Sequence, residues 1–238
     1  MERHYTGVAY DVDTAQIRYR EEHWLFEDKG TPTRLVLYRC SNGQPFARKT
    51  MRYVDTPWTP EFEMIDNRDG YIEGARRTQN QWLVYVQRDA SSARETATLP
   101  ARPNTVIDAG FDDFVRIHWN ELTDEHGMSA AFVMPERLAY LNVKLQPAAK
   151  TVQNGVAAQQ FRMSLAGWLG AIAPSITLTY ALTDQRLIEF VGLSNVRDAR
   201  GKRQRVRIEF ADHDAAPASR EQIRAAETET LVSHCPEP

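Results

Sequence analysis

The residues best suited to chemistry lie in one strand-like segment, residues 17–26, which reads IRYREEHWLF. A β-strand alternates its side chains between two faces, so Tyr19, Glu21 and His23 would share one face. Glu21 and His23 would then lie about 7 Å apart along the strand. From there the carboxylate could orient the imidazole or raise its pKa, as acid/base chemistry requires. The alternative is a bulge, or a strand that crosses from interior to rim, in which case both groups meet water.

Two further candidates, His118 and Trp119, lie on an apolar stripe with helical spacing. We group them with Tyr19, Glu21 and His23 as candidate ligand-binding residues. The alternative for His118 is a core histidine whose ring is hydrogen-bonded to a backbone carbonyl.

Metal and cofactor chemistry finds little support in the sequence. Asp212, His213 and Asp214 offer metal-ligating side chains in one short segment, but a polar segment of this kind is typical of a solvated turn. The glycine-rich phosphate loops, GxSxG and HExxH are all absent from the sequence. We therefore predict no cofactor and no metal, and we favour binding over catalysis.

Basic residues gather in two groups, although the formal net charge is only -3 and gives no reason to expect a nucleic-acid partner. The first group lies within residues 197–207 and predicts a hairpin with a basic outer face. Its residues Arg200, Lys202 and Arg203 could bind an anionic headgroup. A solvated hairpin tip is the alternative. The second group is expected to give the surface a polarised field and consists of Arg34, Arg39, Arg48, Lys49 and Arg52.

The elements that must position these residues read mainly as β-strands. Short segments rich in β-branched and aromatic residues recur along residues 5–99 and 128–210, separated by turn residues. They predict an antiparallel sheet of about 12 to 14 strands. A twisted sheet of that size curls, so we expect a strongly curved half-barrel or incomplete barrel.

Two helices interrupt this pattern. The apolar stripe predicts an amphipathic helix over about residues 109–123, with Asp108 as its N-cap, lying across the open side of the sheet. A short, almost wholly apolar helix is predicted over about residues 164–173. We expect a single domain over residues 1–212 and a mobile tail over residues 213–238.

Several segments together resemble uncharacterised bacterial proteins that are exported to the cell envelope, namely residues 8–11, 19–23, 111–116, 180–182 and 192–195. The expected architecture is also similar to the lipoprotein-carrier type of half-barrel. That likeness implies a curved sheet whose concave face holds acyl chains. Neither resemblance implies a catalytic residue.

The compartment depends on the two ends of the chain. The first residues hold no basic patch followed by an apolar run, which fits a cytoplasmic chain or an exported one whose signal segment has been removed. We prefer a periplasmic or secreted protein. The longest apolar run, residues 165–173, is too short to span a membrane as a helix. Whether Cys40 and Cys235 form a disulfide stays open at this point.

The function that best fits these expectations is an envelope protein that binds a lipid or another apolar ligand in its concave face. One alternative is a hydrolase-like or other enzyme that uses the Glu21 and His23 pair, or His118, in the same cavity. The other is a structural or assembly protein that recruits a partner strand through a sheet edge.

Overall fold

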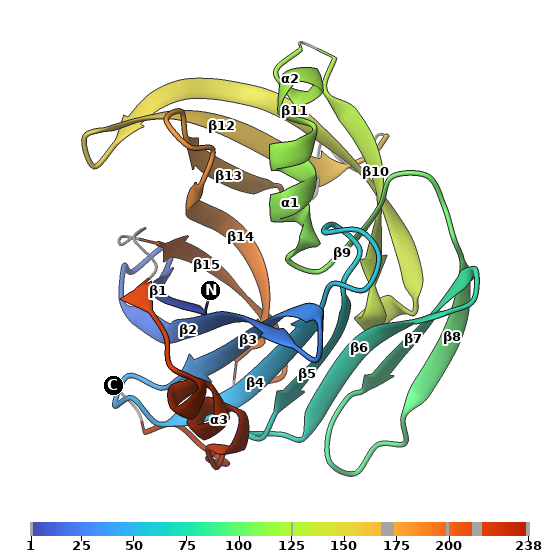
Figure 1. The fold of residues 1–238 in the computed structure, drawn as a ribbon, viewed down its shortest axis with the longest axis vertical. Coiled ribbons are helices and arrows are strands. Elements are labelled where there is room, and N and C mark those ends of the chain that lie inside the picture. The colour runs from blue at the N-terminus through green and yellow to red at the C-terminus, as the bar shows by residue number, and fades with distance from the viewer. Residues whose placement is uncertain (1, 125, 168–173, 199, 211–215, 237–238) are drawn as a thin grey trace.

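The chain folds around one large, curved β-sheet (Figure 1). The structure is a computed structural model and describes residues 2–124, 126–167, 174–198, 200–210 and 216–236. The strands are β1 (Arg3–Asp11), β2 (Ile17–Asp28), β3 (Thr31–Arg39), β4 (Pro45–Arg52), β5 (Glu61–Asp66), β6 (Tyr71–Thr78), β7 (Gln81–Gln87), β8 (Glu95–Pro100), β9 (Thr105–Ile107), β10 (Met128–Met134), β11 (Ala139–Gln153), β12 (Val156–Leu165), β13 (Ile176–Ala181), β14 (Leu187–Arg197), β15 (Arg203–Glu209) and β16 (Ala216–Pro217).

The strand order confirms the predicted curved sheet. It runs β8-β7-β6-β5-β4-β3-β2-β1-β15-β14-β13-β12-β11-β10-β9, with β16 paired to β1. The sheet stays open, with β8 and β9 at its two edges, and β9 pairs with β10 in parallel. It has 16 strands. The sequence pattern missed β9 and β16 because they span three and two residues, which is too short for an alternation to show.

Alternation along the strands divides the side chains between a concave and a convex face. In β2, Tyr19, Glu21 and His23 share one face, while Trp24 and Phe26 lie on the other. The concave face carries the main hydrophobic core, to which strands from β1 to β15 contribute.

The predicted amphipathic helix is present as two shorter pieces, α1 (Gly110–Ile117) and α2 (Trp119–Leu122). The backbone breaks at His118, where φ is -97° and ψ is 24°. Phe114 and Val115 of α1 are fully buried in the main core, so the apolar stripe faces the sheet as its spacing predicts. A short 3-10 helix, η1 (Pro135–Arg137), follows β10. Within the described ranges, no helix combines the length and the apolar character needed to cross a membrane.

The short apolar helix predicted over residues 164–173 is not found where it can be checked. Ser164 and Leu165 are the last residues of β12, paired with Lys144 and Val143 of β11. Residues 168–173 lie outside the described part of the chain.

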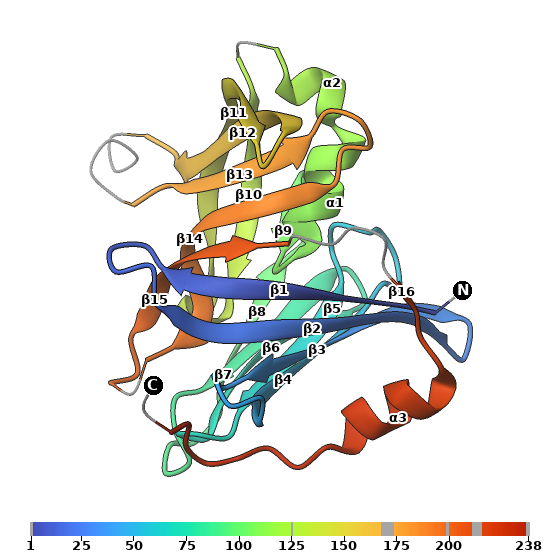
Figure 2. The ribbon, with the colours of Figure 1, turned by 90° about the vertical axis from the view of Figure 1, so that its left-hand side faces the viewer.

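The C-terminal segment packs against the convex face of the sheet, which differs from the mobile tail expected after residue 212. It contains α3 (Arg220–Thr228), which lies outside the sheet beside β2, β3 and β4 (Figure 2). Ser219 caps this helix in a capping box with Gln222. Ile223 and Ala226 pack on the apolar convex side chains Trp24, Phe26, Leu35 and Leu37.

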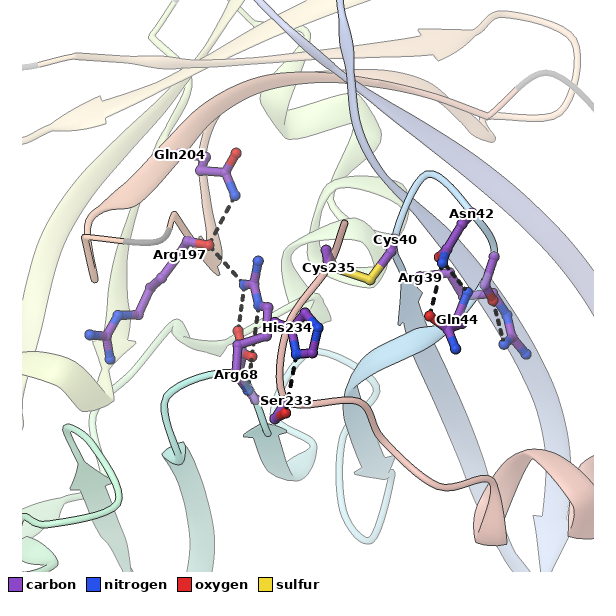
Figure 3. The surroundings of a disulfide bond; sticks show 12 residues. Arg39, Cys40, Asn42, Gln44, Arg68, Arg197, Gln204, Ser233, His234 and Cys235 are labelled. Atoms are coloured by element: carbon purple, nitrogen blue, oxygen red, sulfur yellow. Dashed lines mark hydrogen bonds and ion pairs between the residues drawn. A yellow bond between two sulfur atoms is a disulfide. The ribbon is translucent and has the colours of Figure 1, made fainter. Parts of the chain in front are cut away.

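A disulfide between Cys40 and Cys235 attaches this segment to the sheet (Figure 3). Cys40 directly follows β3, and the two cysteines are 195 residues apart in the sequence. Arg39 forms paired hydrogen bonds to the Glu229 carboxylate at 2.8 and 2.7 Å, just after α3. The backbone N–H of Val232 donates to the carbonyl oxygen of Pro45 at 2.8 Å. Covalent and polar contacts therefore both hold the C-terminal segment in place.

Candidate functional site

The concave face encloses a cavity of about 420 Å³. Strands from both halves of the sheet and the first turns of α1 line it. Most of the wall is apolar, and Val36, Met51, Phe62, Phe111, Phe190 and Phe210 are representative. Charged side chains make up about a third of the lining residues and interrupt this surface.

The register of β1 to β5 explains which residues reach the cavity. Cα pairing aligns one row of side chains across these strands, formed by Arg3, Leu25, Arg34, Met51 and Phe62. The adjacent concave row consists of Tyr5, His23, Val36, Lys49 and Met64. Each row places basic side chains beside apolar ones, and the row that includes Arg3 reaches solvent because Arg3 is exposed.

Glu21 and His23 meet on the cavity wall. His23 Nε2 lies 3.0 Å from Glu21 Oε2, and both residues are only 6% exposed. The Tyr5 ring stacks on the imidazole with centroids 4.4 Å apart. This excludes the alternative in which both groups meet water, because the strand keeps its alternation through residue 25 and both side chains stay on the concave face.

Burial lowers the pKa of His23 because it disfavours the charged imidazolium, although the bond to Glu21 opposes this. A carboxylate oxygen only accepts hydrogen bonds, so the ring donates from Nε2 and a neutral ring leaves Nδ1 without a proton. His23 Nδ1 is buried without a hydrogen-bond partner in the described part of the chain. Glu21 can therefore hold the His23 imidazole in a fixed orientation while the ring stays neutral.

A prediction about pH follows from the His23 pKa. The unfolded chain binds a proton at His23 near pH 6.5, whereas the folded chain binds it only at lower pH. Stability should therefore fall as the pH drops below this value, by at most about 1.4 kcal/mol per pH unit from this group. Urea unfolding at pH 7.5 and pH 5 should show that His23→Gln loses less stability than the wild type.

The matched control is His126→Gln, because the side chain of His126 is 93% exposed. This variant should keep the pH dependence of the wild type. An equal loss in wild type and His23→Gln would contradict the prediction.

A buried ion pair joins β4 to the turn before α1. Lys49 Nζ lies 2.8 Å from Asp108 Oδ2, and Asn195 Nδ2 donates to Asp108 Oδ1 at 3.1 Å. The prediction that Asp108 caps α1 is wrong: Ala109 is the N-cap residue and no side chain bonds there. Lys49, which we expected on the surface, is 5% exposed. Together with Asn195 of β14, the ion pair links three segments around the cavity.

Arg203 lies on the cavity wall rather than in an exposed basic patch. Its guanidinium lies 3.1 Å from Glu73 Oε2 and 2.8 Å from Glu136 Oε2. Burial raises the pKa of Glu73, and the positive charge of Arg203 opposes that rise. The predicted headgroup site is therefore wrong for Arg203, whose charge is already paired. Arg200 and Lys202 are exposed, and their contact with an anion stays a prediction.

Arg34 is a cavity residue that was not among the predicted site residues, because it was expected on the surface. It shares the concave face of β3 with Val36 and Tyr38 and lines the cavity. Its Nε is buried without a hydrogen-bond partner in the part of the chain that the structure describes. Among the described residues no carboxylate forms an ion pair with it, and the guanidinium instead faces the Tyr5 ring, with 5.9 Å from Cζ to the centroid.

The other three predicted site residues do not line this cavity. Tyr19 is 1% exposed, and its hydroxyl donates to Ser194 Oγ at 3.0 Å. His118 pairs with Glu121 at 2.5 Å and packs on the Phe114 ring. Trp119 packs edge-on against core aromatic rings, Phe161 and Tyr180. The structure thus brings Glu21 and His23 together and leaves Tyr19, His118 and Trp119 in packing positions.

The described residues contain no group of three or more metal-ligating side chains. The segment with metal-ligating side chains in the sequence, Asp212, His213 and Asp214, lies outside those residues.

No protein-family model matches the chain, and no curated protein is significantly similar to it in sequence. Among solved structures, an uncharacterised conserved protein from Thermus thermophilus is 10% identical with a TM-score of 0.30, covering 98% of this chain and 90% of that chain. A beta-barrel-like protein of a domain of unknown function from Brucella abortus is 6% identical with a TM-score of 0.41, covering 89% and 97%. A proposed outer membrane lipoprotein-sorting protein domain from Vibrio parahaemolyticus is 6% identical with a TM-score of 0.31, covering 96% and 92%. At these low scores and identities, the likenesses carry no argument about what this chain does.

Proposed function

We propose that this protein binds a lipid or another apolar small molecule in the concave cavity. The observation that supports this most directly is the cavity itself, about 420 Å³ in volume with mostly apolar walls. Ligand sites of small molecules have volumes of this order and combine apolar walls with a few polar groups. Well-packed protein interiors hold few voids larger than a water molecule, so an opening of this size between sheet and helix favours an occupant.

We further propose that the protein works in the cell envelope or outside the cell. The bond between Cys40 and Cys235 supports this, because disulfides persist in oxidising compartments and are rare in the cytosol of most organisms.

Two measurements test the binding function. Protein purified from its native host without denaturation should release an amphiphile into organic solvent, identified by mass spectrometry. A fluorescent fatty acid should bind the delipidated protein, and Val36→Trp, which fills part of the cavity, should weaken that binding at least tenfold. Val54→Trp is the matched control, because Val54 is 47% exposed and does not line the cavity. Empty extracts together with no binding of the probe would contradict the proposal.

A second candidate function is catalysis by Glu21 and His23, favoured by their 3.0 Å contact on the cavity wall. Such a pair could act as an acid/base. Turnover of p-nitrophenyl acyl esters that disappears in both Glu21→Gln and His23→Gln would support this function. Equal rates in wild type and both variants would exclude it.

A further inference from the structure

We propose that the molecule held in the cavity is an anionic amphiphile, whose charged group binds Arg34 while its apolar chain lies along the walls. This inference rests on the proposed binding function and names the class of ligand.

The first support is that Arg34 differs from the other buried or half-buried cations around the cavity. Each of these is paired with a carboxylate: Lys49 at 2.8 Å, Arg116 at 3.0 Å, Arg186 at 3.1 Å and Arg203 at 3.1 Å. Arg34 has no such partner within the described ranges, and its Nε is buried without an acceptor. A buried donor without an acceptor costs free energy, which an anion bound at the guanidinium would recover.

The second support is the apolar surroundings of Arg34. Leu25 and Met51 are its direct cross-strand neighbours, and Phe62 follows Met51 in the same row. All three line the cavity. A ligand bound to Arg34 therefore meets apolar side chains at once, which suits a charged group attached to an aliphatic chain better than a free inorganic anion.

The third support is the second arginine in this row. Arg3 also lines the cavity, has no ion pair with a described residue, and lies two strands from Arg34, about 10 Å at the usual strand spacing. Because Arg3 is exposed, the row leads from solvent into the cavity, and its positive charge would attract an anion toward Arg34.

Neither the acidic cavity residues Asp112 and Asp184 nor the neighbouring Asp113 forms an ion pair with Arg34 in the described part of the chain. Asp112 and Asp113 of α1 both bond to Arg116, at 3.0 and 2.7 Å. Asp184 bonds to Arg186 at 3.1 Å. Asp112 and Asp113 share one cation, Arg116, and the Oδ1 atom of Asp112 is buried without a hydrogen-bond partner among the described residues. These carboxylates weaken the positive field at Arg34, but none of them forms an ion pair with it in the described part of the chain. An anion bound at Arg34 would supply the hydrogen-bond acceptor that the Nε atom lacks among the described residues.

The test compares three ligands that share one aliphatic tail: laurate, dodecanol and dodecylamine. Calorimetric titration of the delipidated full chain, below the micelle concentrations, should show laurate binding at least about tenfold more tightly than the other two, as a charge-assisted, two-pronged contact with arginine implies. Arg34→Gln should remove the preference for laurate and leave the affinity for dodecanol unchanged. Arg34→Lys, which keeps the charge and loses the planar fork, should reduce the preference and provides the readout if Arg34→Gln does not fold.

Arg20→Gln is the matched control, because Arg20 is an exposed arginine on the convex face of β2 and should not affect any of the three affinities. Equal binding of laurate and dodecanol by the wild type would overturn this inference and leave the binding function standing. A preference for laurate that survives in both Arg34 variants would also overturn it. Binding of none of the three would contradict the inference and the proposed function together.

Discussion

Replacing Cys40 and Cys235 by serine should lower the free energy of unfolding by about 5 kcal/mol, on the chain-entropy model of a cross-link that closes a loop of this length. The expected loss is large because the bond connects residues 195 positions apart, so it restricts nearly the whole unfolded chain. Domains are typically stable by about 5–15 kcal/mol, so a change of this size should be plain in a urea unfolding curve. The double variant and the wild type under a reducing agent should give similar midpoints.

Ser233→Ala is the control for a side-chain change beside the bond, and it should leave the free energy of unfolding within about 0.5 kcal/mol of the wild type. Among the described residues, the Ser233 hydroxyl has one hydrogen-bond partner, Nδ1 of the neighbouring His234, at 3.4 Å (Figure 3). A loss below about 1 kcal/mol in the double cysteine variant would contradict the prediction. It would mean that the bond does not form, or that the unfolded chain is already compact.

The bond also determines where the C-terminal segment lies. Without it, α3 depends on Ile223 and Ala226 against the convex face and on the contacts of Arg39 with Glu229. Release of α3 would expose Trp24 and Leu35, which are 6% and 1% exposed in the structure. Limited proteolysis of the reduced protein should therefore cut the C-terminal segment first.

The strands could be predicted from the sequence because each has a local, two-residue alternation. The same alternation placed Glu21 and His23 on one face, and the structure confirms that they share the concave face. The alternation could not predict that β1 pairs with β15, because these strands are far apart in the sequence. That pairing joins the two halves of the sheet and creates the cavity.

Arg34 was misplaced for a related reason. The alternation in β3 puts Arg34, Val36 and Tyr38 on one face, and the apolar Leu35 and Leu37 on the other. Because both faces of this strand carry apolar side chains, the alternation does not show which of them is the concave face. The answer depends on α3, which covers Leu35 and Leu37, and that segment was expected to be a mobile tail. The local signal that could have corrected this was Ser219 followed three residues later by Gln222, a capping box.

For the helix predicted over residues 109–123, the buried face was predicted correctly but the two ends were not. Phe114 and Val115 face the core as their spacing requires. The break at His118 and the role of Asp108 depend on contacts made in the folded state, which no helical spacing encodes. Asp108 has a positive φ of 47° and directs its carboxylate to Lys49 on β4, 59 residues away in the sequence.

This contact leads to the second large effect expected of a substitution. Lys49→Met should lower the free energy of unfolding by about 3–5 kcal/mol, because it removes one partner of a buried ion pair and leaves the Asp108 carboxylate with Asn195 as its one remaining side-chain partner among the described residues. Asp108→Asn, which tolerates the positive φ, should destabilise the protein by a similar mechanism because it leaves the Lys49 ammonium without a counter-charge. Urea unfolding of both variants measures these losses.

The double variant Lys49→Met with Asp108→Asn separates the pair from the rest of the fold. If the two charges depend on each other, the double variant should lose at least about 1 kcal/mol less than the sum of the single losses, because neither charge is then left buried alone. Additive losses would contradict a direct contact.

Since Lys49 and Asp108 also line the cavity, the same variants carry a consequence for binding. Lys49→Met should leave the preference for laurate over dodecanol in place, because the ammonium is already neutralised by Asp108 whereas Arg34 has no such partner among the described residues.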